Sequence, residues 1–425
     1  MKTASGMAIR LAVALVLCLA AGLILAPESI AQNSILSSRL SSRLGHLKHG
    51  INIGRFLDGT VDNPGISQCV TNHDTKSCTY AVTTINASGV DHVRILFEPG
   101  QMLDLTRPGL VEGTSLRALD SLVSQFVNQQ VAVILALSLD EPRFNNKLGK
   151  DPQFLESLKT FWTAIASHYA RLYSPELLFF EVLNEPGLNE PDLTFEQWSG
   201  TGAAGGGIQA ALIRAIRAGA SQKTILATGA ENSDINGLLA LSPPVLSSGN
   251  DANIVYIFHY YEPFSFTHQG ETWNAGNYAY YLSGVRYPYA AGPAAKAAEN
   301  VADLKNRMYA WHSMETATQD WIKTDIEIVS EWAARNKVSV ICDEFGVERQ
   351  HQDPNGFAPS HLVGAAADDR ARWVGDVRQL LEQHGIGWTF WDYSSPSFGL
   401  VPDGDAPGNS VGAALKLTVA PDRKK

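Results

Sequence analysis

The sequence predicts a single (β/α)8 barrel of the TIM type, an α/β fold, and three observations lead to that prediction. Eight short apolar runs rich in Val and Ile recur along the chain. Amphipathic stretches with helical spacing separate several of these runs. Polar and aromatic residues gather at the points where the runs end. Alternating strands and helices indicate a parallel sheet.

The eight apolar runs suit strands that are buried on both faces, as strands of a parallel sheet are. In chain order they are 50–54, 92–97, 131–137, 177–183, 224–229, 254–260, 338–344 and 385–391. Clear amphipathic helices are expected at 115–130, 152–173 and 208–220.

The polar residues at the strand ends favour a closed barrel over an open doubly wound sheet. An open sheet gathers its ligand at one switch point between a few strands, whereas a barrel draws on the carboxyl ends of many strands. Five of the predicted strands contribute here. The residues are Arg94 inside the second strand, Asn184 and Glu185, His259 and Tyr261, Glu344, and Trp391.

The first residues have the pattern of a signal peptide. Lys2 and Arg10 give a positive start, residues 11–26 are apolar, and Ser29 and Ala31 have the spacing that a signal peptidase recognises. We therefore expect a signal peptide at 1–31, a lead-in segment at 32–46 and one barrel domain at 47–425. The alternative is an uncleaved membrane anchor. With cleavage, the protein is expected to be secreted or periplasmic and bacterial.

Charge and cysteines limit the partners. The chain has 33 Lys and Arg against 43 Asp and Glu, and without a basic stripe nucleic acid is not expected as a partner. Cys69 and Cys78 could form a disulfide in an oxidising compartment, or they could be two separate thiols. Cys342 lies in an apolar run and is expected in the core. No Cys/His spacing predicts a metal site.

Two glutamates, Glu185 and Glu344, stand at equivalent places after buried strands. In a barrel both would face one cleft, and paired carboxylates are what glycoside hydrolysis requires. One must be protonated and the other ionised, so their pKa values must differ. We expect Arg94 to lower the pKa of one glutamate, with Tyr261 as a hydrogen-bond donor to it.

Each of these residues also has a simpler interpretation. Glu185 precedes Pro186 and could be part of a turn. Arg94 could be a buried ion-pair partner, His259 a structural histidine and Trp391 a core residue. The argument depends on all of them falling at strand ends of one topology.

These segments together resemble glycoside hydrolase family 5, the cellulase-type retaining glycosidases, over essentially the whole chain after residue 31. The motifs that carry the resemblance are HGINIG (49–54), HVRILF (92–97), LNEP (183–186), FHYYEPF (258–264), CDEFG (342–346) and GWTFWDY (387–393). The resemblance implies double displacement, in which Glu344 attacks the anomeric carbon and Glu185 acts as acid and then as base.

The resemblance also implies substrate-binding roles for Arg94, Asn184, His259, Tyr261 and Trp391. Asn184 would hold the sugar 2-hydroxyl, and Trp391 would stack on a sugar. One position departs from the family pattern, because Ser138 stands where the family often has histidine. This departure puts the substrate in doubt more than the mechanism.

The segment 262–293 is long and aromatic, and we expect it to form one wall of a sugar cleft with Trp273 as a platform; the alternative is a self-packed excursion. The predicted function is an exported endo-β-1,4-glucanase. Alternatives are a β-mannanase, a β-1,3- or β-1,6-glucanase, or an inactive glycan-binding barrel. We expect a monomer that acts on a polysaccharide or oligosaccharide, without cofactor, nucleic-acid partner or stable membrane anchor.

Overall fold

A computed structural model describes residues 40–56, 82–188, 190–200, 206–243, 251, 253–273, 277–290, 296–297, 313–354, 356, 361–395, 397–400 and 410–418. Contacts divide the chain into residues 1–45 and 46–425, and the fold and site below belong to the second unit. The expected signal peptide and the pair Cys69 and Cys78 lie outside the described residues.

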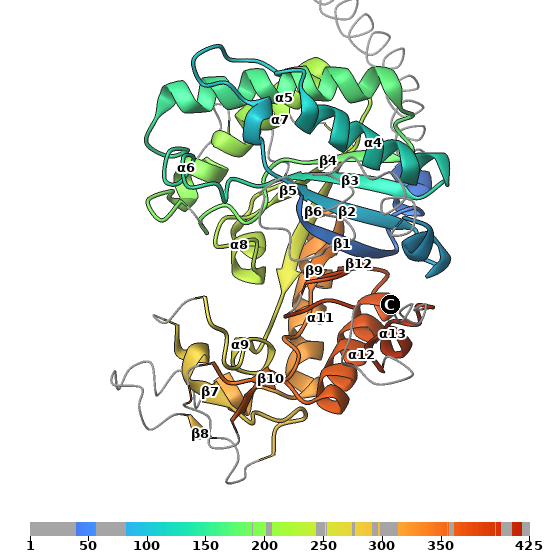
Figure 1. The fold of residues 1–425 in the computed structure, drawn as a ribbon, viewed down its shortest axis with the longest axis vertical. Coiled ribbons are helices and arrows are strands. Elements are labelled where there is room, and N and C mark those ends of the chain that lie inside the picture. The colour runs from blue at the N-terminus through green and yellow to red at the C-terminus, as the bar shows by residue number, and fades with distance from the viewer. Residues whose placement is uncertain are drawn as a thin grey trace, which may run out of the picture. The chain divides into compact units, whose positions relative to one another are not determined.

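Eight parallel strands form a closed barrel in the order β1-β12-β9-β6-β5-β4-β3-β2 (Figure 1). Their bounds are β1 His49–Phe56, β2 His92–Phe97, β3 Ala132–Leu137, β4 Leu178–Glu181, β5 Ile225–Thr228, β6 Ile254–Tyr260, β9 Ser339–Phe345 and β12 Gly387–Phe390. Each lies within or close to a predicted strand, so the predicted barrel is confirmed.

The strands are buried on both faces because each one has barrel interior on one side and helices on the other. β2, β3 and β6 are buried along their whole length, as their Val- and Ile-rich sequences require. Cys342 is a free, buried thiol in β9, as expected for a core residue. Parallel pairing sets Asn52 of β1 beside Arg94 of β2 at one level of the barrel.

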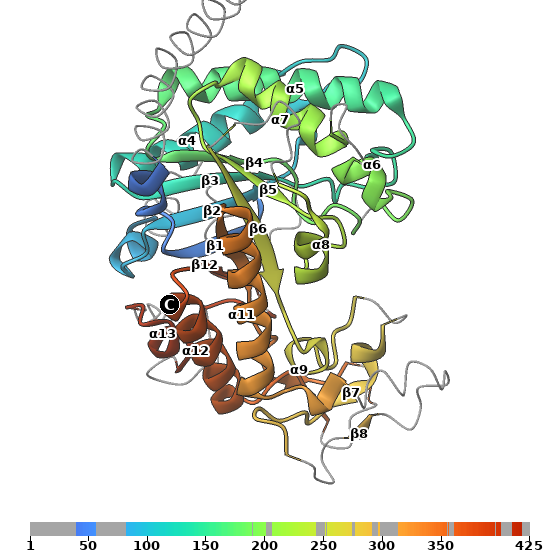
Figure 2. The same cartoon turned by 180° about the vertical axis from the view of Figure 1, so that it is seen from behind.

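The long helices cover the outside of the barrel (Figures 1 and 2). They are α4 Thr114–Asn128, α5 Pro152–Leu172, α7 Ile208–Gly219, α11 Gln319–Asn336 and α12 Ala367–Gln383. α5 begins where the Asp151 side chain accepts from the amides of Gln153 and Phe154, with Pro152 in the first helical position. The three predicted helices are confirmed to within two residues.

Short elements stand at the carboxyl ends of the strands. They are η1 Gly100–Met102, α6 Phe195–Ser199, α8 Ile235–Ala240, α9 Phe264–Thr267, η2 Tyr278–Tyr281, β7 Leu282–Ser283, β8 Lys296–Ala297, β10 His351–Gln352, β11 Leu362–Val363 and α13 Ser410–Leu415 near the C-terminus. β7–β8 and β10–β11 form small antiparallel pairs. Among the described residues, none of the helices has the length and apolar character that crossing a membrane needs.

One irregularity in β9 concerns the site directly. Phe258 of β6 pairs with Cys342, but the next residue, His259, pairs with Glu344. Asp343 is therefore an additional residue, as in a β-bulge. Asp343 and Glu344, although adjacent in sequence, both contact Arg94 in the barrel interior.

Candidate active site

The structure brings together six of the predicted site residues at the carboxyl ends of their strands. Asn184 and Glu185 follow β4, His259 lies in β6 with Tyr261 directly after it, and Glu344 lies in β9. Arg94 reaches the same place from β2.

Arg94 donates hydrogen bonds to four other side chains of the site. Its guanidinium donates twice to Glu181, from Nε to Oε2 (2.6 Å) and from Nη2 to Oε1 (2.7 Å). Nη1 donates to Glu344 Oε1 (2.6 Å) and to Asn52 Oδ1 (3.0 Å), and Nη2 donates to Asn184 Oδ1 (2.7 Å). Arg94 itself is fully buried, so it holds these oxygens away from water.

Two groups donate hydrogen bonds to Glu344. Besides Arg94, the hydroxyl of Tyr261 donates to Oε2 (2.9 Å), and Nδ1 of His259 lies 3.4 Å from that oxygen. Burial raises the pKa of Glu344, although the charge of Arg94 and the hydrogen bond from Tyr261 act to lower it. Arg94 thus acts in the expected direction, but the expected net lowering is wrong because burial outweighs it.

Glu185 occupies a different environment. Its φ of 42° lies in the left-handed region, which a side chain other than Gly rarely adopts and which often marks a functional residue. Burial, then the charge of Asp140, raise its pKa to about 8. Nδ1 of His259 lies 2.8 Å from Glu185 Oε1. Glu185 is therefore suited to carry a proton at neutral pH.

The two glutamates both lie beside Nδ1 of His259. Oxygens of Glu185 and Glu344 and a nitrogen of His259 lie within 4.8 Å of one another. Arg94 counters the rise in the pKa of Glu185, whereas both Arg94 and the hydrogen bond from Tyr261 counter it at Glu344. The arrangement can place a proton on one carboxyl and a negative charge on the other.

The chain matches the model of the family Cellulase (glycosyl hydrolase family 5) over residues 58–397. It belongs to glycosyl hydrolase family 5. It is therefore a glycosidase, as the sequence predicted.

Two curated relatives are endoglucanases by name. Endoglucanase 3 of Fibrobacter succinogenes is 29% identical over 301 residues, which are 69% of this chain and 41% of that protein. The chain thus spans about two fifths of the length of that relative. Endoglucanase C of Acetivibrio thermocellus is 24% identical over 363 residues, or 83% of this chain and 92% of that protein.

Solved structures share the fold. Cel5A of Thermotoga maritima, solved with cellobiose and with mannotriose, is 22% identical with a TM-score of 0.63. The alignments cover 88% of this chain and 98% of that chain. They support the barrel fold.

In this family 5 glycosidase, the predicted sugar-binding residues Asn184 and Trp391 lie after β4 and β12. Because Nη2 of Arg94 donates to Oδ1 of Asn184, the amide nitrogen Nδ2 of Asn184 remains as a donor. The indole of Trp391 lies against Gly54, where a Cβ would come within 2.8 Å of the ring. Only glycine at position 54 therefore allows the ring this position.

Ser138 stands where the family resemblance leads us to expect histidine, and that departure stays a prediction. Ser138 follows β3, is 1% exposed and lies beside Glu98. Burial, then the charge of Asp140, raise the pKa of Glu98 to about 7. Glu98, which follows β2, and Asp140, which follows β3, therefore place acidic groups beside this small hydroxyl.

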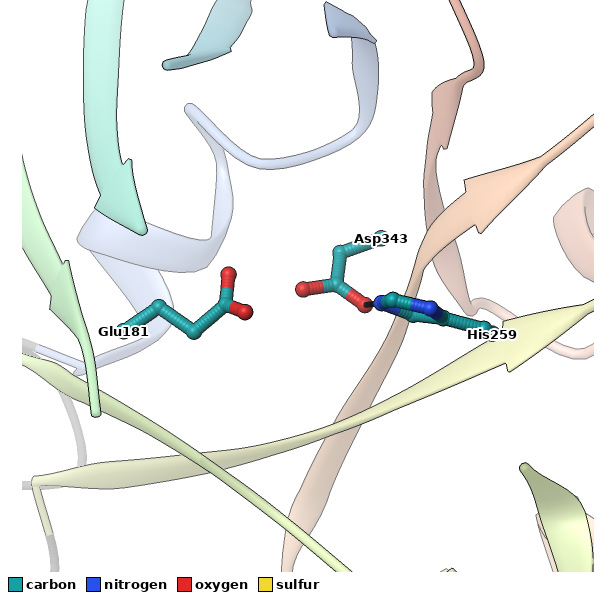
Figure 3. A group of neighbouring side chains, drawn as sticks. All are labelled: Glu181, His259 and Asp343. Carbon is teal, nitrogen blue, oxygen red and sulfur yellow. Dashed lines mark ion pairs between the residues drawn. The ribbon is translucent and has the colours of Figure 1, made fainter. Parts of the chain in front are cut away.

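Three further site residues were missed from the sequence: Asn52, Glu181 and Asp343. Glu181 and Asp343 are fully buried carboxyl groups within ion-pair distance of Arg94. They lie near His259 (Figure 3). Asn52 donates from Nδ2 to the carbonyl of Asp343 (2.9 Å). A charged residue within the apolar run LLFFEVL was the available signal for Glu181. Nothing in the sequence distinguished Asp343 from an outward-facing strand residue.

Two sets of side chains in the described part of the chain could each reach a single cation. They are Glu181, His259 and Asp343, and Glu185, His259 and Glu344. Arg94 already hydrogen-bonds to Glu181 and Glu344, so a cation would compete with its guanidinium for the same oxygens. The donor set fits a glycosidase site, and chemistry without a metal stays a prediction.

Proposed function

We propose that this family 5 glycosidase is a retaining endo-β-1,4-glucanase with Glu344 as nucleophile and Glu185 as acid and base. The observation that carries the proposal is the closeness of the two carboxyl groups, because one oxygen of each lies within 4.8 Å of the other beside His259. Retaining glycosidases hold their carboxyl groups about 5–5.5 Å apart, whereas inverting ones leave about 6.5–9.5 Å for a water molecule.

The geometry supports the first step of double displacement. Arg94 and Tyr261 each hold one oxygen of Glu344 and orient the carboxylate toward a sugar in the cleft. Glu344 attacks the anomeric carbon while Glu185 gives its proton to the leaving oxygen. Nδ2 of Asn184 is the donor proposed for the sugar 2-hydroxyl, a contact that strengthens in the transition state.

In the second step Glu185, now ionised, takes a proton from water, and the hydroxide attacks the anomeric carbon. The bond to Glu344 breaks, and the sugar is released with its original configuration. Burial and the charge of Asp140 favour the return of the proton to Glu185. No cofactor enters these steps.

The names of the relatives guide the substrate proposal. Both curated relatives are endoglucanases, and the structure of Cel5A with mannotriose makes β-mannan the first alternative. Trp391 and the exposed Trp273 are proposed sugar platforms. We propose that the chain acts as a monomer after export by a signal peptide at 1–31. A disulfide between Cys69 and Cys78 would accompany export.

A panel of glycans tests the assignment. Wild type, Glu344→Gln and the exposed control Glu112→Gln are incubated with carboxymethylcellulose, β-mannan, β-1,3-glucan and β-1,6-glucan. We expect fastest release of reducing ends from carboxymethylcellulose, a loss of at least about 1,000-fold in Glu344→Gln, and wild-type rates in the control.

Proton NMR during the first minutes of hydrolysis tests the stereochemistry. The β-anomer should appear first and then mutarotate. Initial formation of the α-anomer would refute double displacement. Glycan binding without hydrolysis by wild type on every substrate would instead identify an inactive glycan-binding barrel.

A further inference from the structure

Asp343 is a buried acid that the proposed mechanism does not use. It is the additional residue of the β9 bulge and is 0% exposed. Its Oδ2 lies 3.3 Å from Nε of Arg94, and its Oδ1 lies 3.5 Å from Nε2 of His259. Figure 3 shows the carboxyl of Asp343 between Glu181 and His259.

Charge balance indicates that Asp343 is neutral. Glu181, Asp343 and Glu344 surround one guanidinium, so three ionised carboxylates would leave two uncompensated negative charges in the interior, which is unfavourable. Glu181 receives two hydrogen bonds from Arg94, whereas Asp343 has only the longer contact. Burial, then repulsion from Glu181, raise the pKa of Asp343 well above its usual range. A proton on Asp343 would be donated to Glu181, an interaction that raises the pKa of Asp343 and lowers the pKa of Glu181.

His259 is neutral as well, and its two nitrogens face different acids. Burial lowers its pKa to about 4, so at neutral pH the ring carries one proton. Nδ1 faces Glu185 at 2.8 Å and also lies 3.4 Å from Oε2 of Glu344, whereas Nε2 faces Asp343 at 3.5 Å. Because the proton of Asp343 is directed to Glu181, its Oδ1 can only accept. The ring proton therefore belongs on Nε2.

We propose that Asp343 is a positioning residue that fixes the tautomer of His259. Its Oδ1 lies 3.5 Å from Nε2, a ring nitrogen without a hydrogen-bond partner among the described residues, and attracts the ring proton there. The lone pair of Nδ1 is thereby held toward Glu185. That lone pair accepts a hydrogen bond from protonated Glu185, which disfavours the ionised form of Glu185. The effect on catalysis rests on the proposed role of Glu185 as the acid, whereas the tautomer of His259 does not.

The groups that face His259 come from several elements, and all of them enter the pH dependence. They are Arg94 from β2, Glu181 and Glu185 from β4 and its loop, Asp234 at the start of α8, and Asp343 and Glu344 from β9. Of these, only Asp343 lies against Nε2 within ion-pair distance in the described residues.

Two substitutions distinguish a neutral acceptor from a charge. Asparagine in Asp343→Asn can accept from Nε2–H and donate to Glu181, so it reproduces the neutral acid. Alanine in Asp343→Ala removes the acceptor, which allows the proton to move to Nδ1 and to stabilise ionised Glu185. We expect wild-type pH profiles of kcat/KM in Asp343→Asn. In Asp343→Ala we expect the basic limb to move down by about one pH unit, which is about a fivefold loss of kcat/KM at pH 8, where Glu185 titrates.

Nitrogen-15 NMR of labelled histidine reads the tautomer directly, with the His259 signals identified by their loss in His259→Asn. Wild type and Asp343→Asn should carry the proton on Nε2, and Asp343→Ala should shift toward Nδ1–H. A wild-type signal for Nδ1–H would overturn the proposal even if Asp343→Ala failed to fold. A basic limb that moves equally in both variants would show a charged Asp343 and would also overturn it.

The two proposals can fail separately. If the wild type hydrolyses no glycan, the proposed function fails, while the NMR signals still test the tautomer. If the wild type is active but its tautomer is wrong, only the positioning role of Asp343 fails.

Discussion

Arg94 joins groups that would otherwise repel one another. The same guanidinium donates to Glu181, Glu344, Asn184 and Asn52. Breaking a buried ion pair by removing one partner costs about 3–5 kcal/mol. A neutral residue at this position would therefore destabilise the fold, and a cation with fewer donors is the better probe of function.

Lysine in Arg94→Lys keeps the charge but cannot hold Glu181 with two parallel hydrogen bonds and also reach Glu344. Because Arg94 acts to lower the pKa of Glu344, its loss should raise that pKa further. Less Glu344 would then be ionised in mild acid. We expect the acidic limb of the kcat/KM profile to move up by about one pH unit.

The control for this prediction is Arg107→Lys, at a side chain that is 88% exposed and pairs with Asp104. Its acidic limb should match that of wild type. An unchanged limb in Arg94→Lys would mean that the guanidinium does not set the ionisation of the nucleophile.

The sequence predicted the functional residues that stand out at strand ends, and the structure brings Arg94, Glu185, His259 and Glu344 together. It did not predict Asp343, because regular alternation directs every second side chain outward and the bulge breaks that rule. The net direction of the pKa shift at Glu344 was also wrong, since the degree of burial depends on the complete fold.

At the scale of elements, the segment that begins with α9 connects the proposed cleft wall to the nucleophile. The indole of Trp273 lies 5.9 Å from the ring of His268, and that ring lies 5.1 Å from Tyr261, centroid to centroid. Tyr261 donates to Glu344. Trp273 is 57% exposed, which suits an open platform better than a core residue.

Trp273→Ala should weaken the binding of long glycans because it removes the exposed aromatic face. We expect KM for long oligosaccharides to rise about three- to tenfold, corresponding to about 0.5–1.5 kcal/mol of aromatic contact. The kcat for a short chromogenic glycoside should stay unchanged. Trp321→Ala, at a 44% exposed indole on α11, is the matched control. Equal KM values in wild type and Trp273→Ala would favour a self-packed segment.

At the scale of the whole molecule, several buried carboxyl groups share one physical property. Burial is the first cause that raises the pKa of Glu98 and Glu190 to about 7, and of Glu185 and Glu348 to about 8. In each case the folded state binds a proton that the unfolded state has lost at neutral pH. The contribution of these protonated groups to the free energy of unfolding is therefore fully present below about pH 4.5, and it is lost as pH rises toward 8.

Glu348→Gln tests this dependence outside the proposed catalytic residues. Glu348 is 1% exposed, and Glu271 adds repulsion to the effect of burial. Glutamine resembles the protonated acid and does not titrate. The Tm should therefore match that of wild type near pH 4.5 and exceed it by roughly 5 °C at pH 8.

The control for the stability prediction is the exposed Glu315. Differential scanning calorimetry of Glu315→Gln should give Tm values that follow wild type across this pH range. A Glu348→Gln curve parallel to wild type would show that Glu348 is ionised in the folded protein.

The architecture could be predicted from the sequence because parallel strands buried on both faces leave long apolar runs, such as those that became β3 and β6. The ends of elements were less certain, since they depend on tertiary contacts: 177–183 was expected as a strand, and β4 covers Leu178–Glu181. The small pairs β7–β8 and β10–β11 have only two residues a strand, too few for any periodicity to reveal.

The additional residue in β9 also offers a lesson for protein engineering. With Asp343 inserted, one strand presents two acids at nearly the same height of the barrel, while the pairing of β6 with Glu344 resumes one step later. The strand order and the neighbouring loops need no change. A designer who wishes to add a functional group beside an existing one in a barrel enzyme could therefore insert a single residue into a strand, instead of rebuilding a loop.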